Sequence, residues 1–334
     1  MLKIGIAGVG RLGRFHAGKF LADPRCELAG VYDINERRSA EAARDFGVKD
    51  FRGYDELIAA CDAVDIAATT SAHHELAKAA LLAGKPVFVE KPLCAELAQA
   101  EELVALAEER GLKIQVGHIE RFNPVILEAE QYIREPLFIE STRISSFQPR
   151  GTDVSVVLDL MIHDIDLILD FVQSPLDAVH ANGAGILTPS LDIANARLEF
   201  ASGAVANVTS SRVGLKQERR IRFFQRDAYI SLDLVNHRGS LIRQSARAGE
   251  LLQRMLRGET GIEPEELIDA RSLEPGSSGK DALALELEAW VEAILEDKKP
   301  VVDGQAGLRA LRAAARIGAA ISRQNLFTNG SKKA

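Results

Sequence analysis

A lysine at the end of an apolar run is the residue best placed in this sequence to do chemistry. Lys91 follows Val87, Phe88 and Val89, a run typical of a strand buried in a parallel sheet. Such sheets bind ligands just beyond the carboxyl ends of their strands. A lysine there can hold charge against a reacting oxygen, or release a proton where burial lowers its pKa. An ordinary solvated loop lysine fits this run alone equally well.

A second group of residues with chemical potential lies near the middle of the chain. On a helix, Asp159 and His163 are i and i+4, and Asp166 is i+3 from the histidine, so all three share one face. An imidazole beside a carboxylate suits the proton transfer that accompanies oxidation of a secondary alcohol by nicotinamide. For a single such pair, a structural histidine on an acidic face is the simpler explanation. No metal site is predicted, because further ligands at suitable spacing are not apparent.

A glycine-rich loop near the N-terminus predicts a dinucleotide site. Gly8, Gly10 and Gly13 match G-x-G-x-x-G, directly after an apolar run and directly before a helical pattern. They would permit a tight turn, the approach of a pyrophosphate and close helix–strand packing, in that order. Asp33 ends the next apolar run about 20 residues further on, where a carboxylate binds the ribose hydroxyls. We therefore expect NAD, with NADP less favoured, although Arg37 or Arg38 could accept the 2′-phosphate of NADP.

The elements that would position these residues begin with a parallel sheet. Up to about residue 120, short apolar runs alternate with helical patterns, which predicts an α/β, doubly wound sheet of the Rossmann type. We assign residues 1–121 to this dinucleotide-binding domain. Its expected strands span residues 3–7, 27–32, 63–67, 86–89 and 113–116.

The rest of the chain, residues 122–334, predicts an α+β domain for substrate binding and oligomerisation, with a mostly antiparallel open sheet. Residues 236–280 are polar and contain one helical pattern at 249–256, and they could form a lid, an oligomer contact or a mobile insertion. The other expected helices span 124–134, 154–172, 282–295 and 304–323, and the strands 137–147, 178–187, 192–200, 204–213, 219–224 and 228–234.

The bulk properties narrow the class of protein. The chain has 334 residues, 46% of them hydrophobic and 27% charged, as in ordinary globular enzymes. A net charge of −7 argues against nucleic acid as the main partner. Three scattered cysteines fit a reducing compartment, and no apolar stretch reaches membrane-spanning length. Because an apolar run and the glycine loop directly follow Met1, we expect no signal peptide and a cytoplasmic protein without a membrane partner.

Taken together, these motifs resemble the Gfo/Idh/MocA family of oxidoreductases, which includes glucose-fructose oxidoreductase and inositol dehydrogenase. The resemblance covers nearly the whole chain. It is carried by the glycine loop, the segment 69–74, the tripeptide Glu90-Lys91-Pro92, and the Asp159, His163, Asp166 spacing. The tripeptide is far more specific than the glycine loop.

The resemblance implies a lysine, an aspartate and a histidine around the reacting carbinol, here Lys91, Asp159 and His163. The histidine accepts the proton, and the lysine holds and polarises the substrate oxygen. The implied coenzyme contacts are Gly8, Gly10, Arg11, Leu12, Gly13, Asp33, Arg37, Thr69, Thr70, His74, Glu90 and Lys91. The implied substrate contacts are His118, Arg121, Asn123 and Arg150, together with the three catalytic residues.

Two departures from the family pattern would reshape the pocket without touching the chemistry. Ser155-Val156-Val157 replaces the glycines that often precede the catalytic helix, and Thr70 replaces a common proline. Residues 117–124 and 159–166 look most like those of nucleotide-sugar dehydrogenases that oxidise C3 of UDP-N-acetylglucosamine. For such a substrate, a diphosphate could be met by Arg121, Arg143 and Arg150, although ordinary salt bridges explain these arginines equally well.

Two other functions stay open at this point. One is a free-sugar or inositol-type dehydrogenase or reductase. The other is a non-catalytic, NAD(P)-sensing regulator, which predicts a broken lysine, aspartate and histidine set, whereas all three residues are present. The family also implies a homodimer or homotetramer formed through the C-terminal sheet.

Overall fold

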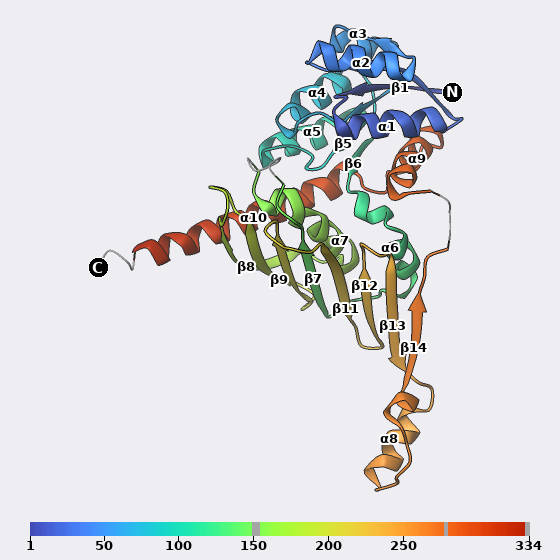
Figure 1. The fold of residues 1–334 in the computed structure, drawn as a ribbon, viewed down its shortest axis with the longest axis vertical. Helices are drawn as coiled ribbons and strands as arrows, with labels where there is room; N and C mark the ends of the chain where they lie inside the picture. Colours follow the sequence, from blue (N-terminus) through green and yellow to red (C-terminus); the bar gives the residue numbers. More distant parts are fainter. Residues whose placement is uncertain (149–153, 277–279, 331–334) are drawn as a thin grey trace. The chain divides into compact units, whose positions relative to one another are not determined.

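The computed structural model describes residues 1–148, 154–276 and 280–330 and divides the chain into two units (Figure 1). The first unit comprises Met1–Phe122 and Gly279–Ala315, and the second comprises Asn123–Ser278 and Arg316–Ala334. Each unit is described by itself below. None of the described helices is both long enough and apolar enough to cross a membrane.

A six-stranded parallel sheet forms the centre of the first unit, which confirms the predicted Rossmann fold. Its strands lie in the order β3-β2-β1-β4-β5-β6, so successive strands are added on one side of β1 up to β3 and on its other side from β4 onward. The strands are β1 (Leu2–Ala7), β2 (Cys26–Tyr32), β3 (Lys49–Asp50), β4 (Ala63–Ile66), β5 (Val87–Glu90) and β6 (Ile114–Gly117). The two-residue strand β3 was not predicted, because it is too short to show any periodicity.

Helices cover both faces of this sheet because its strands alternate apolar side chains between two cores. On one face, Ile4 and Ile6 belong to a core cluster with residues of α1 (Arg11–Ala22), α2 (Glu36–Phe46) and α9 (Ala282–Leu295). Gly5 points to the opposite face, where a Cβ would lie 2.8 Å from Leu57 of α3. The helices on that side are α3 (Tyr54–Ala60), α4 (Thr70–Leu82) and α5 (Leu97–Arg110).

The chain returns to the first unit near its C-terminus, whereas the sequence analysis had counted both closing helices with the second domain. Trp290 of α9 packs 6.0 Å from Phe20 and 5.7 Å from Phe88, measured between ring centroids. The Gln115 side chain donates a 2.9 Å hydrogen bond to the carbonyl of Glu286. These contacts place α9 beside α1, where Figure 1 also shows it. An amphipathic helix pattern alone does not tell which sheet the helix covers.

An eight-stranded sheet dominates the second unit and confirms the predicted, mostly antiparallel architecture. Its order is β14-β13-β12-β11-β7-β10-β9-β8, and of the described strands β7 and β10 pair in parallel while the other neighbours are antiparallel. The strands are β7 (Phe138–Ile144), β8 (Leu176–Ala184), β9 (Ile193–Phe200), β10 (Val205–Ser211), β11 (Glu218–Phe224), β12 (Ala228–Asp233), β13 (Arg238–Gln244) and β14 (Ile268–Leu273).

One face of this sheet is apolar and the other is polar. Phe171 of helix α7 (Ile162–Val172) packs against Phe223 of the sheet with ring centroids 5.1 Å apart. Strand residues on the opposite face pair with one another, as Glu140 does with Arg222 at 3.0 Å. Oligomer formation through this sheet stays a prediction. The remaining helical elements are α6 (Pro124–Ala129), α8 (Ala248–Leu256), α10 (Gly304–Gly330) and the short turns Ile119–Phe122, Glu130–Tyr132 and Pro264–Leu267.

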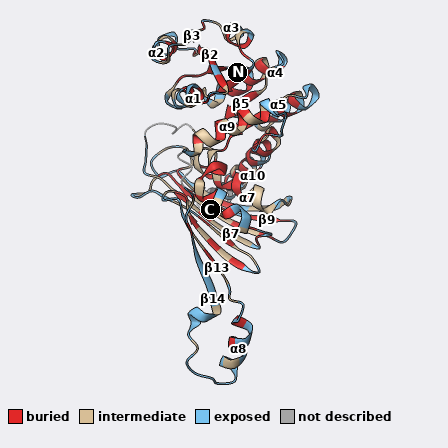
Figure 2. Ribbon diagram, turned by 90° about the vertical axis from the view of Figure 1, so that its right-hand side faces the viewer, coloured by how far each residue is buried: buried red, intermediate tan, exposed pale blue. Residues whose placement is uncertain are grey.

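Residues 236–280 contribute more structure than their sequence indicated. The predicted helix is present as α8, but β13 and β14 also extend the sheet by two strands. Figures 1 and 2 show α8 at the far end of this hairpin, with much of its surface exposed. Strand β14 was not predicted: five of its six residues are exposed, and its apolar–polar alternation extends only from Ile268 to Arg271, which is too short to indicate a strand.

Candidate active site

The glycine loop has the geometry that a bound pyrophosphate requires. Gly8 adopts a φ of +94°, and a Cβ there would lie 2.6 Å from the backbone of Ala68. A Cβ on Gly13 would lie 1.9 Å from the carbonyl oxygen of Gly8, so the start of α1 can approach β1 only with glycine at this position. At Gly10, by contrast, a Cβ would meet nothing within 4 Å. Gly8 and Gly13 therefore pack closely against neighbouring backbone, whereas the space beside Gly10, where the phosphates would lie, is open.

Helix α1 starts at this loop and exposes its first turn. Gly10 is the N-cap residue, and the next two side chains, Arg11 and Leu12, are exposed. A helix start of this kind binds phosphate through its backbone N–H groups and its positive dipole end. The residues present thus fit the pyrophosphate of NAD.

Asp33 is fixed at the end of β2 by hydrogen bonds to the backbone. Its carboxylate accepts from the N–H of Val9 at 3.0 Å and from the N–H of Asn35 at 2.9 Å, and the residue is only 7% exposed. A guanidinium nitrogen of Arg38 lies 3.4 Å from the same carboxylate, whereas Arg37 pairs with Glu41 at 2.9 Å. Of the two arginines, Arg38 is therefore the one beside the predicted ribose site.

The turn after β4 carries Thr69 and Thr70, which are exposed and half-buried at the start of α4. His74 lies on the same helix, but its Nε2 pairs with Glu102 of α5 at 2.7 Å. The preceding histidine, His73, is the one whose ring reaches the turn after β5. Its Nδ1 lies 2.9 Å from the carbonyl of Pro92, and burial lowers the pKa of His73. The predicted coenzyme contact of His74 stays a prediction, and His73 was missed.

Lys91 is half-buried, and the residue before it is held in a buried cluster. The Glu90 carboxylate accepts from the backbone N–H of Lys91 at 3.2 Å. His16 of α1 lies between two carboxylates, with Nδ1 2.9 Å from Asp65 and Nε2 3.3 Å from Glu90. The sequence analysis missed His16 and Asp65. A signal for them existed, because His16 falls on the buried stripe of α1, between Gly13 and Phe20.

The segment that follows β6 carries three residues that were predicted to bind the substrate. His118 and Arg121 are 1% and 8% exposed and belong to the first unit. Asn123, in the second unit, caps α6 through its side-chain oxygen and donates to the carbonyl of Leu234 at 3.0 Å. Asn123 therefore has a structural role in this turn, and its contact with substrate stays a prediction. Arg150 lies outside the described residues.

The second unit carries Asp159 and His163 in a helix that does not begin as an ordinary α-helix. Residues Val157–Met161 form a π-helix, which α7 continues. Single π-helical turns are rare and are frequent at functional sites. Asp159 and His163 are both half-buried, whereas Asp166 is buried. The prediction that Lys91 joins these residues spans the two units, and it stays a prediction.

A buried ion pair fixes the helix directly beside His163. Arg143 of β7 donates to both carboxylate oxygens of Asp164, at 2.6 and 3.1 Å, and both side chains are 2% exposed. Of the two roles that the sequence left open for Arg143, the structure supports the salt bridge. Arg212 anchors the chain just before the π-helix, since it donates to the carbonyl of Val154 at 2.7 Å. These contacts hold the predicted base on the sheet.

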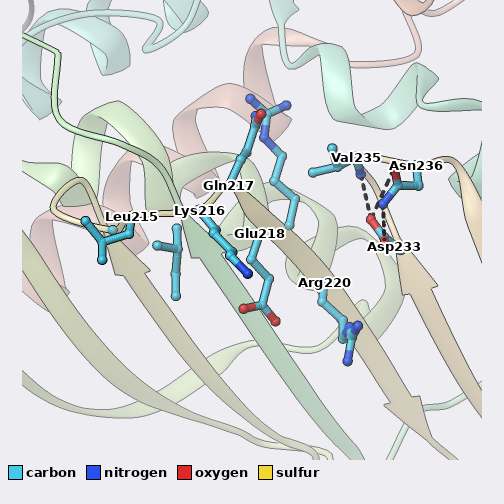
Figure 3. A pocket seen from close by; sticks show the side chains of 11 residues that line it. Leu215, Lys216, Gln217, Glu218, Arg220, Asp233, Val235 and Asn236 are labelled. Atoms are coloured by element: carbon cyan, nitrogen blue, oxygen red, sulfur yellow. Dashed lines mark hydrogen bonds between the residues drawn. The ribbon is translucent and has the colours of Figure 1, made fainter.

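A surface pocket of about 630 Å³ in the second unit contains none of the predicted site residues (Figure 3). It is lined by Ile144, residues 214–220, Asp233, Val235 and Asn236. Figure 3 shows that the Asp233 carboxylate accepts hydrogen bonds from the backbone N–H of Val235 and the side-chain amide of Asn236, in the turn that follows it. Among the residues that the structure describes, no three His, Cys, Asp or Glu side chains are grouped so as to hold a metal ion.

Comparisons with known proteins identify the family of the chain. Residues 2–118 match the profile described as the GFO/IDH/MocA oxidoreductase family with an NAD-binding Rossmann fold, and residues 134–231 match the GFO/IDH/MocA C-terminal domain. The UDP-N-acetylglucosamine 3-dehydrogenase of Acidithiobacillus ferrooxidans is 36% identical over 96% of this chain and 97% of its own. Its crystal structure superposes with a TM-score of 0.85 at 34% identity, over 96% of this chain and 97% of that one.

A more distant relative is the myo-inositol 2-dehydrogenase of Thermotoga maritima, which is 27% identical over 90% of this chain and 98% of its own. The near full-length similarity to an A. ferrooxidans dehydrogenase, the two matching domain profiles and the NAD-type glycine loop lead to one conclusion. The chain belongs to the GFO/IDH/MocA oxidoreductase family and is a dehydrogenase that acts on CH–OH groups.

Proposed function

We propose that this protein is an NAD-dependent nucleotide-sugar dehydrogenase that oxidises the C3 hydroxyl of UDP-N-acetylglucosamine to a ketone. The observation that carries the proposal is the similarity to the A. ferrooxidans enzyme with that activity, which spans 96% of this chain and 97% of the relative. Similarity in the nucleotide-binding domain alone would not support the assignment of a particular substrate. Similarity through the second unit as well does so, because His163, the proposed proton acceptor, lies in that unit.

NAD would be held by the loop from Gly8 to Gly13, by the first turn of α1 and by the Asp33 carboxylate. When bound, the nicotinamide supplies the acceptor for the hydride that leaves the carbinol carbon. The Asp33 carboxylate would repel a 2′-phosphate, which favours NAD.

His163 takes the proton of the substrate hydroxyl in this proposal, since an imidazole can serve as a base near neutral pH. Lys91 holds the same oxygen and stabilises the negative charge that develops on it as the proton leaves. Asp159 precedes His163 by four residues in the helical segment, and its carboxylate favours the imidazolium that forms. The proton goes to His163 and the hydride to NAD, so the products are a ketone and NADH.

A panel of substrates tests the proposal. Purified protein is mixed with NAD and, separately, with UDP-N-acetylglucosamine, other UDP-sugars, free hexoses and myo-inositol, and NADH is followed by fluorescence. We expect turnover with UDP-N-acetylglucosamine and a kcat/KM at least tenfold lower with the free sugars. Turnover of myo-inositol or a hexose alone would assign the protein to the cyclitol or free-sugar dehydrogenases. Binding of NAD without turnover of any alcohol would instead favour a sensor.

A matched pair of lysine variants tests the chemistry. Lys91→Ala should lower kcat by about 100-fold or more while the Kd for NAD changes little, because one preorganised cation at a developing oxyanion has about that effect. Lys113→Ala is the control, since Lys113 directly precedes β6 and pairs with Asp297 at 2.6 Å. If NAD affinity fell as far as kcat in Lys91→Ala, Lys91 would serve the coenzyme and not the reaction.

A further inference from the structure

Three ionisable side chains are buried together beside the peptide of Lys91. His16 and Asp65 are completely buried and Glu90 is 8% exposed. They come from three different elements, α1, β4 and β5, and the imidazole of His16 bridges the two carboxylates at 2.9 and 3.3 Å. Phe88, on the same strand as Glu90, packs edge-on against the His16 ring with centroids 5.5 Å apart. A charge cluster of this kind in a Rossmann core is costly unless it is internally paired.

The cluster is paired through a charged imidazole. Burial alone would lower the pKa of His16, but the Asp65 and Glu90 carboxylates outweigh it and raise the pKa of His16 to about 10. Burial raises the pKa of Asp65, and the imidazolium opposes that rise. The charged ring therefore donates a hydrogen bond from Nδ1 to Asp65 and attracts the Glu90 carboxylate, which lies 3.3 Å from its Nε2, as an ion pair. Held on one side by His16, the Glu90 carboxylate accepts from the N–H of Lys91 with its other oxygen.

From these contacts we propose that His16 and Asp65 are positioning residues for Lys91. They fix the Glu90 carboxylate, and Glu90 in turn fixes the backbone of Lys91 at the end of β5. The inference rests on the role proposed above for Lys91. A displacement of a catalytic group by about 1 Å can cost about 100-fold in rate, so such support has a measurable consequence.

Two further contacts restrict the same turn. A Cβ on Gly117 would lie 2.9 Å from the Glu90 carboxyl carbon, so the end of β6 also restricts the space of this carboxylate. The His73 ring, with Nδ1 2.9 Å from the carbonyl of Pro92, holds the residue after Lys91. The lysine is thus fixed through the residues on both sides of it. Because His16 lies on α1, the same cluster links the helix that starts at the glycine loop to Lys91.

Asp65→Asn tests the proposal, because it keeps the shape of the side chain and removes the anion that holds the imidazolium. We expect kcat to fall about 10- to 100-fold while the Kd for NAD stays within about threefold of the wild type. Asp23→Asn is the matched control: it breaks an ion pair with Arg25 at the far end of α1 and should leave kcat unchanged. Gly117→Ala displaces Glu90 without changing a charge, and should lower kcat in the same way.

A double variant separates positioning from a general loss of structure. If the cluster acts through Lys91, Asp65→Asn should lower the single-turnover rate of Lys91→Ala by less than twofold, since the lysine is no longer there to be positioned. If the two effects multiply instead, the inference is overturned and the role of Lys91 stands. An unchanged kcat in Asp65→Asn and in Gly117→Ala would also overturn it. An unchanged kcat in Lys91→Ala would remove the proposed role of Lys91 and this inference together.

Discussion

The buried imidazolium of His16 should give the first unit a pH-dependent stability that can be measured directly. The group has a pKa of about 10 in the folded chain, against an ordinary value of 6.5. The folded chain therefore binds this proton more strongly than the unfolded chain does. The stabilisation is complete below about pH 6.5 and is lost progressively as the pH rises toward 10.

The size of the effect follows from the number of protons. Between these two pKa values the folded chain holds one proton at His16 that the unfolded chain has released. The free energy of unfolding then falls by about 1.4 kcal/mol for each pH unit. From pH 7 to pH 9, this single group accounts for a loss of about 3 kcal/mol. Asp65 and Glu90 are the charged groups that face the ring, and both are carboxylates that favour its protonated form.

Urea unfolding at pH 7, 8 and 9 measures the effect, with His16→Gln as the variant that lacks the proton. The chain has one tryptophan, Trp290, and it packs in the core of the first unit, so its fluorescence reports the unfolding of that unit. We expect the stability difference between wild type and His16→Gln to shrink by about 3 kcal/mol from pH 7 to pH 9. The control is His180→Gln, because His180 is exposed. Parallel curves for wild type and His16→Gln would refute a charged His16.

Three shorter predictions concern the coenzyme loop and the helix that carries His163. Asp33→Asn should weaken NAD binding about tenfold and narrow the preference for NAD over NADP in fluorescence titrations, because the charge that repels a 2′-phosphate is gone. Gly13→Ala should abolish measurable NAD binding, because its Cβ would lie 1.9 Å from the carbonyl oxygen of Gly8. Arg143→Met should lower the free energy of unfolding by about 3–5 kcal/mol, since it leaves the Asp164 carboxylate buried and unpaired. In thermal melts, the double variant Arg143→Met with Asp164→Leu should recover most of that loss.

The first unit could be predicted well from sequence because its signals are local. Short runs rich in valine and isoleucine mark buried parallel strands, and the glycine loop follows the first of them directly. The elements that sequence reasoning assigned to the other domain were α9 and the first part of α10. The apolar face of α9 shows that it covers a sheet, but the identity of that sheet depends on contacts such as Trp290 with Phe20, which join residues far apart in the chain.

The second unit was predicted as an architecture but not in its details. The helix at residues 154–172 was expected to be regular, whereas Val157–Met161 is a π-helix. A π-helix needs one extra residue per turn, and no residue type in this stretch signals it. Strand β14 is nearly all exposed and pairs with β13 through its backbone, so its sequence carries only a short and weak hydrophobic pattern. Both features arise from packing and hydrogen bonding that the local sequence does not encode.

The buried charged residues could be recognised in the sequence, but their partners could be identified only from the fold. Asp65 interrupts the apolar run of β4, and a carboxylate in a parallel strand with both faces covered must have an internal partner. The sequence thus predicts that Asp65 has a buried polar partner, but that partner, His16, is 49 residues away on a different element. The same holds for Arg143 and Asp164, which are 21 residues apart. A charged residue in a fully buried strand therefore predicts that a partner exists. Which residue that partner is depends on the topology, which here brings α1 and β4 together.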